Sequence, residues 1–280
     1  MIKDVVLIGL GGVGTVYASK IPDIKISVDD ARLKKYTENP ITVNGKKYNF
    51  NYITKIDKAD LIIISAKFYG LTDILNNLSV TPNTIIISLM NGISSEDIIS
   101  AKFPQAIVVP SYLICNSIIR NGNSVIHDDI NKIVMAPNKE LEEFFTSCNI
   151  NYEIAEDIKS SMWQKFMLNI AANQLSAVTR MTFGEMNSLP YIDSLLRNIL
   201  KEVIEIANAE GIKNPEVLAE NAINTFKNMA PYGKTSMLQD IENGRKTELD
   251  AFALTVINLG KKHRIPTPYS NVFQYLIARK

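Results

Sequence analysis

The sequence of 280 residues predicts two parts of different fold class, an α/β part of residues 1–157 and an all-helical part of residues 158–280. In the first part, short runs of Ile, Leu and Val alternate with helix-like segments, which is typical of a mostly parallel sheet with helices on both faces. A glycine-rich turn separates the first such run from the first helix. After about residue 157 no strand pattern follows, and long helical segments are separated by Gly and Pro.

The elements of the first part follow from the spacing of its apolar residues. Continuous apolar runs predict buried strands, and Asn44-Gly45 in the alternating segment Ile41–Asn51 predicts a hairpin. In chain order, the predicted strands are Asp4–Ile8, Ile24–Val28, Asp60–Ala66, Thr84–Met90, Ala106–Val109, Val125–His127, Lys132–Met135 and Asn151–Ala155. The predicted helices are Val13–Lys20, Arg32–Glu38 and Leu71–Leu78.

In the second part, each predicted helix ends where a helix breaker occurs, such as Pro190, Gly211 or Pro266. The predicted helices are Ile158–Thr179, Ile192–Glu210, Pro215–Lys227, Ser236–Lys262 and Asn271–Arg279.

Composition excludes several classes of function. Lys and Arg number 30 and Asp and Glu number 29, so the net charge of +1 leaves no basic excess for binding a nucleic acid. The longest apolar runs have the length of strands and fall short of the roughly 20 residues of a membrane helix. Without a secretory leader, the two cysteines are expected to be thiols in the cytoplasm. Two histidines and no metal-ligand spacing argue against a metal site.

Residues Gly9-Leu10-Gly11-Gly12-Val13-Gly14 match the spacing G-x-G-x-x-G and lie between a predicted strand and a predicted helix. Glycines at this spacing permit a tight turn and let the backbone approach a pyrophosphate, which then lies at a helix N-terminus. The motif therefore predicts a Rossmann-type dinucleotide-binding domain.

The choice between NAD and NADP stays open at this stage. Asp29 lies 20 residues after Gly9 (29 − 9 = 20), where an acid would bind the ribose 2′-hydroxyl of NAD. Arg32, Lys34 and Lys35 follow at once, and cations at this point could hold the 2′-phosphate of NADP.

Polar residues follow two of the predicted parallel strands. Lys67 comes directly after one strand, and Asn91-Gly92 comes directly after the next. Ligands of open α/β sheets bind outside the carboxyl ends of the strands, so we expect these residues at the binding site.

A third signal lies on the first helix of the second part, where Lys165, Asn169 and Asn173 are spaced four residues apart. This spacing places them in one stripe, among apolar neighbours, and Asn is a mediocre helix former that exposed faces seldom use. We expect a polar row that lines a cleft, with Lys165 as the candidate general acid. Further on, Ser236 with Gln239 fits a capping box, whose helix N-terminus suits a carboxylate.

The order and spacing of these motifs resemble those of the ketopantoate reductase family over nearly the whole chain. The family's glycine motif, strand-end Lys, Asn-Gly turn and Lys-x-x-x-Asn-x-x-x-Asn helix match the residues described above. Its Ser-Met-Leu-Gln-Asp stretch matches Ser236–Asp240, and the following Thr-Glu-(Ile/Leu)-Asp matches Thr247–Asp250. The resemblance implies a Rossmann-type domain followed by an all-α domain like the C-terminal domain of 6-phosphogluconate dehydrogenase.

The resemblance also implies a reaction, the reduction of ketopantoate to pantoate by NADPH on the route to pantothenate and coenzyme A. Lys165 would protonate the developing alkoxide, and Glu248 would position Lys165, the cofactor or the substrate. Asn169, Asn173 and Ser236 would bind the substrate. The glycine motif would bind the cofactor together with Arg32, Lys67 and Asn91.

Two departures from the family pattern keep the substrate open. Cys115-Asn116-Ser117 stands where the family often has a Thr-His-Ala-like segment, and Phe183 stands where some members have a substrate-side Asn. The alternatives are a reductase of another branched 2-oxo acid and a dinucleotide-binding regulator without catalysis. The apolar faces of the helical part could form either a homodimer interface or the core of the domain.

Overall fold

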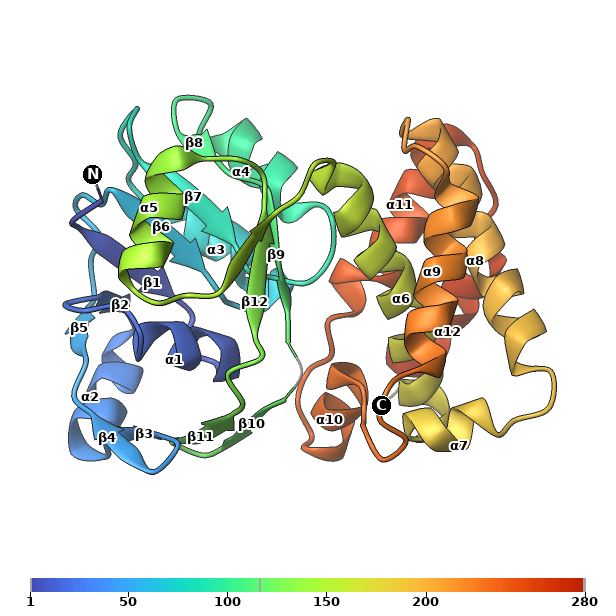
Figure 1. Cartoon of the computed structure of the whole chain (residues 1–280), viewed down its shortest axis with the longest axis horizontal. Helices are drawn as coiled ribbons and strands as arrows, with labels where there is room; N and C mark the ends of the chain where they lie inside the picture. The colour runs from blue at the N-terminus through green and yellow to red at the C-terminus, as the bar shows by residue number, and fades with distance from the viewer. Residues whose placement is uncertain (1, 116, 279–280) are drawn as a thin grey trace. The chain divides into compact units, whose positions relative to one another are not determined.

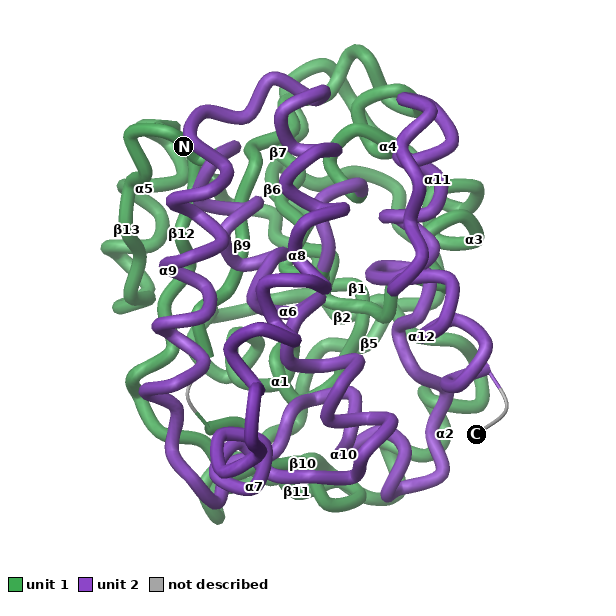
Figure 2. Tube along the Cα trace, turned by 90° about the vertical axis from the view of Figure 1, so that its right-hand side faces the viewer, with its two compact units in different colours: residues 1–91, 95–158 green, residues 92–94, 159–280 purple. Residues whose placement is uncertain are grey.

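The computed structural model describes residues 2–115 and 117–278, and the chain divides into two compact units. The first unit contains residues 1–91 and 95–158, and the second contains residues 92–94 and 159–280 (Figures 1 and 2). The chain thus contributes a short segment to the second unit well before the helical part begins.

The first unit is built on a six-stranded sheet in which every neighbouring pair is parallel, as predicted. Strands β1, β6 and β7 are buried along their whole length, as expected from their runs of Val, Leu and Ile. In spatial order, the strands are β5 (Asn51–Ile53), β2 (Lys25–Ser27), β1 (Val5–Ile8), β6 (Leu61–Ile64), β7 (Ile85–Ser88) and β8 (Ile107–Val108).

Helices cover both faces of this sheet. Successive strand residues point to opposite sides and therefore pack against different helices. Ile63 lies in a core shared with α1, α2 and α5, whereas Ile62 lies in a core shared with α3 and α4. The α/β class is therefore confirmed, including its two covered faces. The helices of this unit are α1 (Gly12–Ala18), α2 (Asp30–Glu38), the 3-10 helix η1 (Phe68–Gly70), α3 (Leu71–Asn76), α4 (Ser95–Lys102) and α5 (Lys139–Ser147).

Two smaller sheets complete the first unit and were not separated by the sequence prediction. One has the order β10-β11-β3-β4, and the other has the order β13-β12-β9. The predicted hairpin joins β3 to β4, and both turn residues, Asn44 and Gly45, have positive φ. The strands are β3 (Ile41–Val43), β4 (Lys46–Tyr48), β9 (Ser111–Ile114), β10 (Ile118–Asn121), β11 (Ser124–His127), β12 (Lys132–Met135) and β13 (Tyr152–Ile154).

In the second unit, all regular secondary structure among the residues that the structure describes is helical, as predicted. The prediction of a single long helix over Ser236–Lys262 is wrong. The helix α10 ends before Gly244, which has a φ of +62°. The helices are α6 (Ile158–Thr179), α7 (Phe183–Asn187), α8 (Ile192–Ala209), α9 (Pro215–Lys227), α10 (Ser236–Glu242), the 3-10 helix η2 (Leu249–Ala251), α11 (Ala253–His263) and α12 (Pro268–Ala278).

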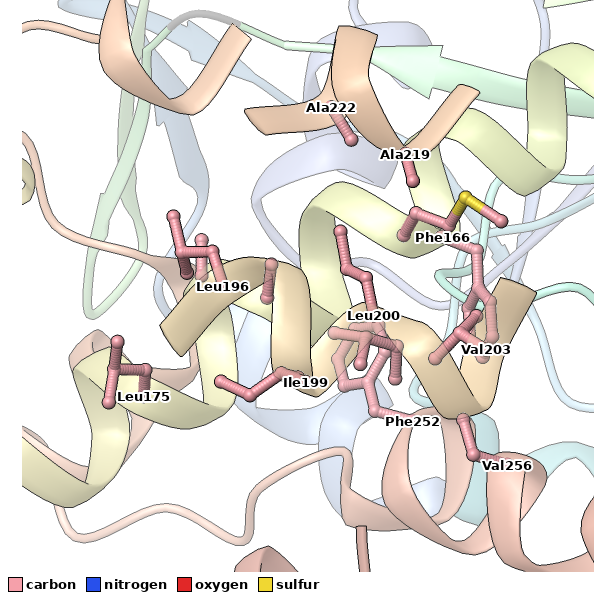
Figure 3. Packing of buried hydrophobic residues seen from close by; sticks show 14 of the residues in the cluster. Phe166, Leu175, Leu196, Ile199, Leu200, Val203, Ala219, Ala222, Phe252 and Val256 are labelled. Atoms are coloured by element: carbon pink, nitrogen blue, oxygen red, sulfur yellow. The ribbon is translucent and has the colours of Figure 1, made fainter. Parts of the chain in front are cut away.

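The core of the second unit is assembled around α6 and α8. Figure 3 shows Phe166 of α6 and Leu200 of α8 close to Phe252, which precedes α11. On α8, Leu196, Leu200 and Val203 recur at intervals of three and four residues, so one face of this helix is buried. None of the helices described is both long and apolar enough to traverse a bilayer.

Candidate active site

The glycine-rich loop follows β1, and the structure gives its glycines different tasks. Gly9 has a φ of +97°, and a Cβ atom there would lie 2.6 Å from the backbone between Ser65 and Ala66. A Cβ atom at Gly14 would overlap the carbonyl oxygen of Gly9. Gly11, by contrast, is exposed, and a Cβ atom there would meet nothing within 4 Å. Gly11 is therefore the position at which a ligand can approach the bare backbone.

At the end of β2, the two residues that indicated different cofactors bind each other. Asp29 caps α2 by accepting a hydrogen bond from the backbone N–H of Arg32 at 2.7 Å. Its second carboxylate oxygen lies 2.8 Å from Nη1 of Arg32. Asp29 and Arg32 therefore form an ion pair at the start of α2.

The parallel sheet brings together the polar residues that follow its central strands. Because β1, β6 and β7 are neighbours, Gly9, Lys67 and Asn91 lie at the same carboxyl edge. Lys67 and Asn91 are both half-buried. Gly92 has a φ of +100°, and a Cβ atom there would lie 3.1 Å from the carbonyl oxygen of Ala251 in η2.

The polar row of the second unit lies on α6 as predicted. Lys165 and Asn169 are half-buried, and Asn173 is only 6% exposed. The Asn173 side-chain amide donates a hydrogen bond of 3.3 Å to the amide oxygen of Asn169. The neighbouring Phe166 and Ile170 belong to the unit's core, so the row is held against a fixed helix.

Ser236 and Glu248 flank segments that pack in the same core as α6. Ser236 is exposed and is the first residue of α10, and Met237 next to it is buried in that core. The capping-box prediction for Ser236 is wrong, because the preceding Thr235 caps α10 by accepting from the N–H of Leu238 at 3.1 Å. Glu248 precedes η2 and is 4% exposed.

Sequence reasoning missed a buried polar cluster at the end of β7. The Ser88 hydroxyl lies 2.9 Å from the Ser95 hydroxyl, which donates to the Glu96 carboxylate at 2.9 Å. Ser88 also accepts a bond from the backbone N–H of Met90 at 3.3 Å, beside Asn91. Burial raises the pKa of Glu96 to about 7. The signal that the sequence offers for this cluster is that Ser88, Ser95 and Glu96 all lie within residues 88–96.

Sequence reasoning also missed Arg120, which lies on β10. Its Nη1 donates to the carbonyl oxygen of Leu10, in the glycine-rich loop. A long sequence separation divides these two residues, so no local motif could have paired them.

The two departures from the family pattern have different structural settings. Phe183 begins α7, and its ring meets that of Phe226 edge-on with the centroids 6.1 Å apart, which gives it a packing role. Cys115 is exposed, while Asn116 lies outside the described residues. No cluster of three or more His, Cys, Asp or Glu suited to a metal ion occurs among the residues that the structure describes.

Comparison with known proteins agrees with the motif analysis. The chain is 25% identical to a 2-dehydropantoate 2-reductase of Pyrococcus horikoshii, and the match covers 98% of this chain and 96% of that protein. A PanE/ApbA family ketopantoate reductase from Ralstonia eutropha JMP134 has a similar structure, with a TM-score of 0.85 and 19% identity over 99% of this chain and 97% of that one. A complex of D-mandelate dehydrogenase with NADH is also similar, with a TM-score of 0.88 and 20% identity over 99% and 98% of the two chains.

Family models settle the classification. Residues 5–140 match the model of ketopantoate reductase PanE/ApbA, and residues 157–280 match the model of its C-terminal region. With nearly the whole chain covered in the order found in the family, the chain belongs to the ketopantoate reductase PanE/ApbA family of oxidoreductases.

Proposed function

We propose that the chain is a 2-dehydropantoate 2-reductase, which reduces the ketone of ketopantoate to the alcohol of pantoate with NADPH, for pantothenate and coenzyme A biosynthesis. The observation that supports this proposal most directly is the polar row on α6, where Lys165 is followed by the hydrogen-bonded pair Asn169 and Asn173. Family membership supplies the reaction class. We further propose that residues 1–157 bind the cofactor and residues 158–280 bind the substrate.

The glycine-rich loop fits a dinucleotide, because Gly11 leaves open the space that a side chain would fill. Around it, we assign cofactor binding to the whole motif Gly9-Leu10-Gly11-Gly12-Val13-Gly14 and to Arg32, Lys67 and Asn91. Lys67 and Asn91 follow the strands next to β1 and so share its carboxyl edge. The bound cofactor supplies the hydride that reduces the ketone carbon.

In the second unit, we assign the proton transfer to Lys165. Its charged ammonium group stabilises the negative charge that develops on the ketone oxygen and then gives up one proton to it. Asn169 and Asn173 bind the polar groups of the substrate. Ser236, exposed at the first turn of α10, binds the carboxylate, and the buried carboxyl group of Glu248 positions the reacting groups.

The preference for NADP is supported by the pairing of Asp29 with Arg32. Arg32 takes one acceptor position on each oxygen of the Asp29 carboxylate and offsets its charge, which makes this carboxylate a weaker acceptor for the ribose hydroxyl of NAD. The Arg32 side chain is 64% exposed and carries donors beyond those used by Asp29, which suits a 2′-phosphate.

A second candidate is a reductase of another 2-oxo acid. The observation that favours it is the structural similarity to D-mandelate dehydrogenase, whose complex holds NADH. Phe183 also puts an aromatic ring at a position where some relatives have an Asn.

Oxidation of the reduced cofactor, followed by its absorbance, tests both candidates. Purified protein would receive NADPH or NADH, with ketopantoate or with a panel of branched and aromatic 2-oxo acids. Fast oxidation of NADPH with ketopantoate alone supports the first candidate, and activity only with another acid supports the second. Binding of nucleotide without oxidation in any pair would instead indicate a dinucleotide-binding regulator.

Lys165→Ala should lower the rate of ketone reduction by roughly 10²–10⁴-fold, because the general acid is lost. Its matched control is Lys159→Ala on the same helix, where the exposed Lys159 donates to the backbone oxygen of Glu210 at 3.0 Å. The control should keep the wild-type rate. Equal rates for both variants would remove Lys165 from the mechanism.

The remaining expectations are a homodimer and a cytoplasmic location, with no nucleic acid and no membrane as partner. Light scattering on the purified protein tests the first, and fractionation of the source cells tests the second.

A further inference from the structure

The hairpin of β10 and β11 lies directly against the glycine-rich loop. A Cβ atom at Gly12 would lie only 2.9 Å from Cγ2 of Ile118, so this glycine makes room for the hairpin. Two residues further on, the Arg120 guanidinium reaches the loop and donates from Nη1 to the carbonyl oxygen of Leu10. The hairpin therefore contacts the loop through both packing and a charged hydrogen bond.

Two further bonds fix the Arg120 side chain. Its Nε donates to the carbonyl oxygen of Gly122 at 3.0 Å, in the turn of the same hairpin. Its Nη2 lies 3.4 Å from the hydroxyl of Tyr36, a residue of α2 that is 6% exposed. The Tyr36 ring stacks on Tyr52 with the centroids 5.7 Å apart, so the hydroxyl is held in place. Arg120 thus joins the loop after β1 to the helix after β2, the two elements that bracket the adenosine half of a dinucleotide in this fold.

The charge of Arg120 has no counter-ion within the part of the chain that the structure describes. All three of its acceptors there are neutral oxygens, two carbonyl groups and one hydroxyl. A guanidinium group has five N–H donors, so two of them remain for another acceptor. Half-buried cations are normally paired with an anion, and this one lies beside a loop built for a pyrophosphate.

We propose that Arg120 is a positioning residue for the cofactor, which holds the Leu10 carbonyl and places a positive charge beside the pyrophosphate-binding loop. The proposal rests on the proposed use of a nicotinamide dinucleotide. It assigns to the β10–β11 hairpin a part in cofactor binding that the glycine motif alone does not contain. Because NADPH and NADH share the pyrophosphate, Arg120 should affect both equally.

The test compares Arg120→Leu, Arg120→Gln and Arg120→Lys with the wild type by calorimetric titration of NADPH and of NADH. Arg120→Leu should raise both dissociation constants about 10–100-fold, as expected for loss of a charge-assisted contact. Arg120→Lys, which keeps the charge, should recover most of the affinity, and Arg120→Gln, which is shorter and neutral but keeps a hydrogen-bond donor, should lie between the two. The wild-type affinity should also fall more steeply with added NaCl than that of Arg120→Leu.

A positioning role also predicts a split in the kinetic constants. The KM for the cofactor should rise in Arg120→Leu, while kcat at saturating cofactor should stay within about threefold of wild type. Lys47→Leu is the control, because Lys47 is an exposed cation on β4, at the opposite edge of the same four-stranded sheet. It should leave both dissociation constants unchanged.

Several outcomes would overturn the proposal. Unchanged affinity in Arg120→Leu would do so, and so would a loss confined to NADPH, which would place the charge at the 2′-phosphate instead. A lower melting temperature with unchanged affinity would reduce Arg120 to a structural role. If the wild type binds neither nucleotide, the proposed function fails as well; if it binds both but reduces no ketone, only the proposed function fails.

Discussion

Replacing Gly11 with alanine should weaken cofactor binding and leave the stability of the fold nearly unchanged. Gly11 has a φ of −76° and a ψ of −165°, which an alanine adopts without strain. A Cβ atom there would meet no protein atom within 4 Å. The substitution therefore adds one methyl group to the space that we assign to the pyrophosphate and to nothing else.

The expected magnitudes follow from this geometry. Alanine lowers the entropy of the unfolded chain, which stabilises by about 0.4–1 kcal/mol at a compatible site. It is also a poorer N-cap than glycine, and Gly11 caps α1, so a loss of about 0.5–1 kcal/mol opposes this gain. The free energy of unfolding should therefore change by less than about 0.5 kcal/mol. The added methyl group should cost at least one charge-assisted hydrogen bond to phosphate, about 1.5–3 kcal/mol, or roughly 10–150-fold in Kd.

Gly14→Ala provides the contrast, because its Cβ atom would overlap the Gly9 carbonyl oxygen. The backbone at Gly9 cannot move aside as easily as a side chain can, so Gly14→Ala should lose about 1–3 kcal/mol of stability. Urea unfolding measures stability, and calorimetric titration with NADPH measures affinity. The reasoning fails if Gly11→Ala binds NADPH as tightly as wild type, or if it is destabilised as much as Gly14→Ala.

Three further predictions concern stability. Leu200→Ala removes a fully buried side chain from the centre of the helical core and should cost about 2–5 kcal/mol in urea unfolding. Glu202→Ala should cost about 2–4 kcal/mol by the same assay, because the carboxylate accepts bonds from the N–H groups of Tyr269 and Ser270 at 3.0 and 2.8 Å at the start of α12. For Glu96, burial raises the pKa from 4.5 to about 7, so the folded state holds the proton more tightly than the unfolded state. The stability of the wild type should therefore fall by about 3 kcal/mol as the pH rises from about 4.5 to about 7 and then level off, whereas Glu96→Gln should lack this fall.

Much of the helical unit could be predicted from local sequence. The bounds of α6 and α9 agree with the prediction, and Pro215 at the first position of α9 marks its start clearly. The break after α10 was missed because a single Gly244 within an otherwise helical pattern does not show whether the helix stops. In the structure, Gly244 has a positive φ and the helix ends before it.

In the α/β unit, the prediction succeeded where the signal is local and failed where pairing is distant. The buried strands β1, β6 and β7 are continuous apolar runs, which need no knowledge of their partners. The strand β10 is half exposed and carries Arg120 within a mixed sequence. Its partner β11 pairs in turn with β3, and in this pairing Val125 lies opposite Val43. The two residues are 82 positions apart in the sequence (125 − 43 = 82). No periodicity within a short window contains that information.

The candidate site shows the same limit at the level of single residues. Asp29 and Arg32 indicated two different cofactors when each was considered alone, because each residue type suits a different group on the ribose. In the structure, the carboxylate binds both the backbone and the side chain of Arg32. Neutralising Asp29 therefore would not simply delete an NAD-binding acid, since it would also remove the helix cap and release the arginine. With the cofactor site that we propose, we therefore expect the preference between NADP and NAD to depend on the pair, and a substitution of either residue must be interpreted through its effect on the other.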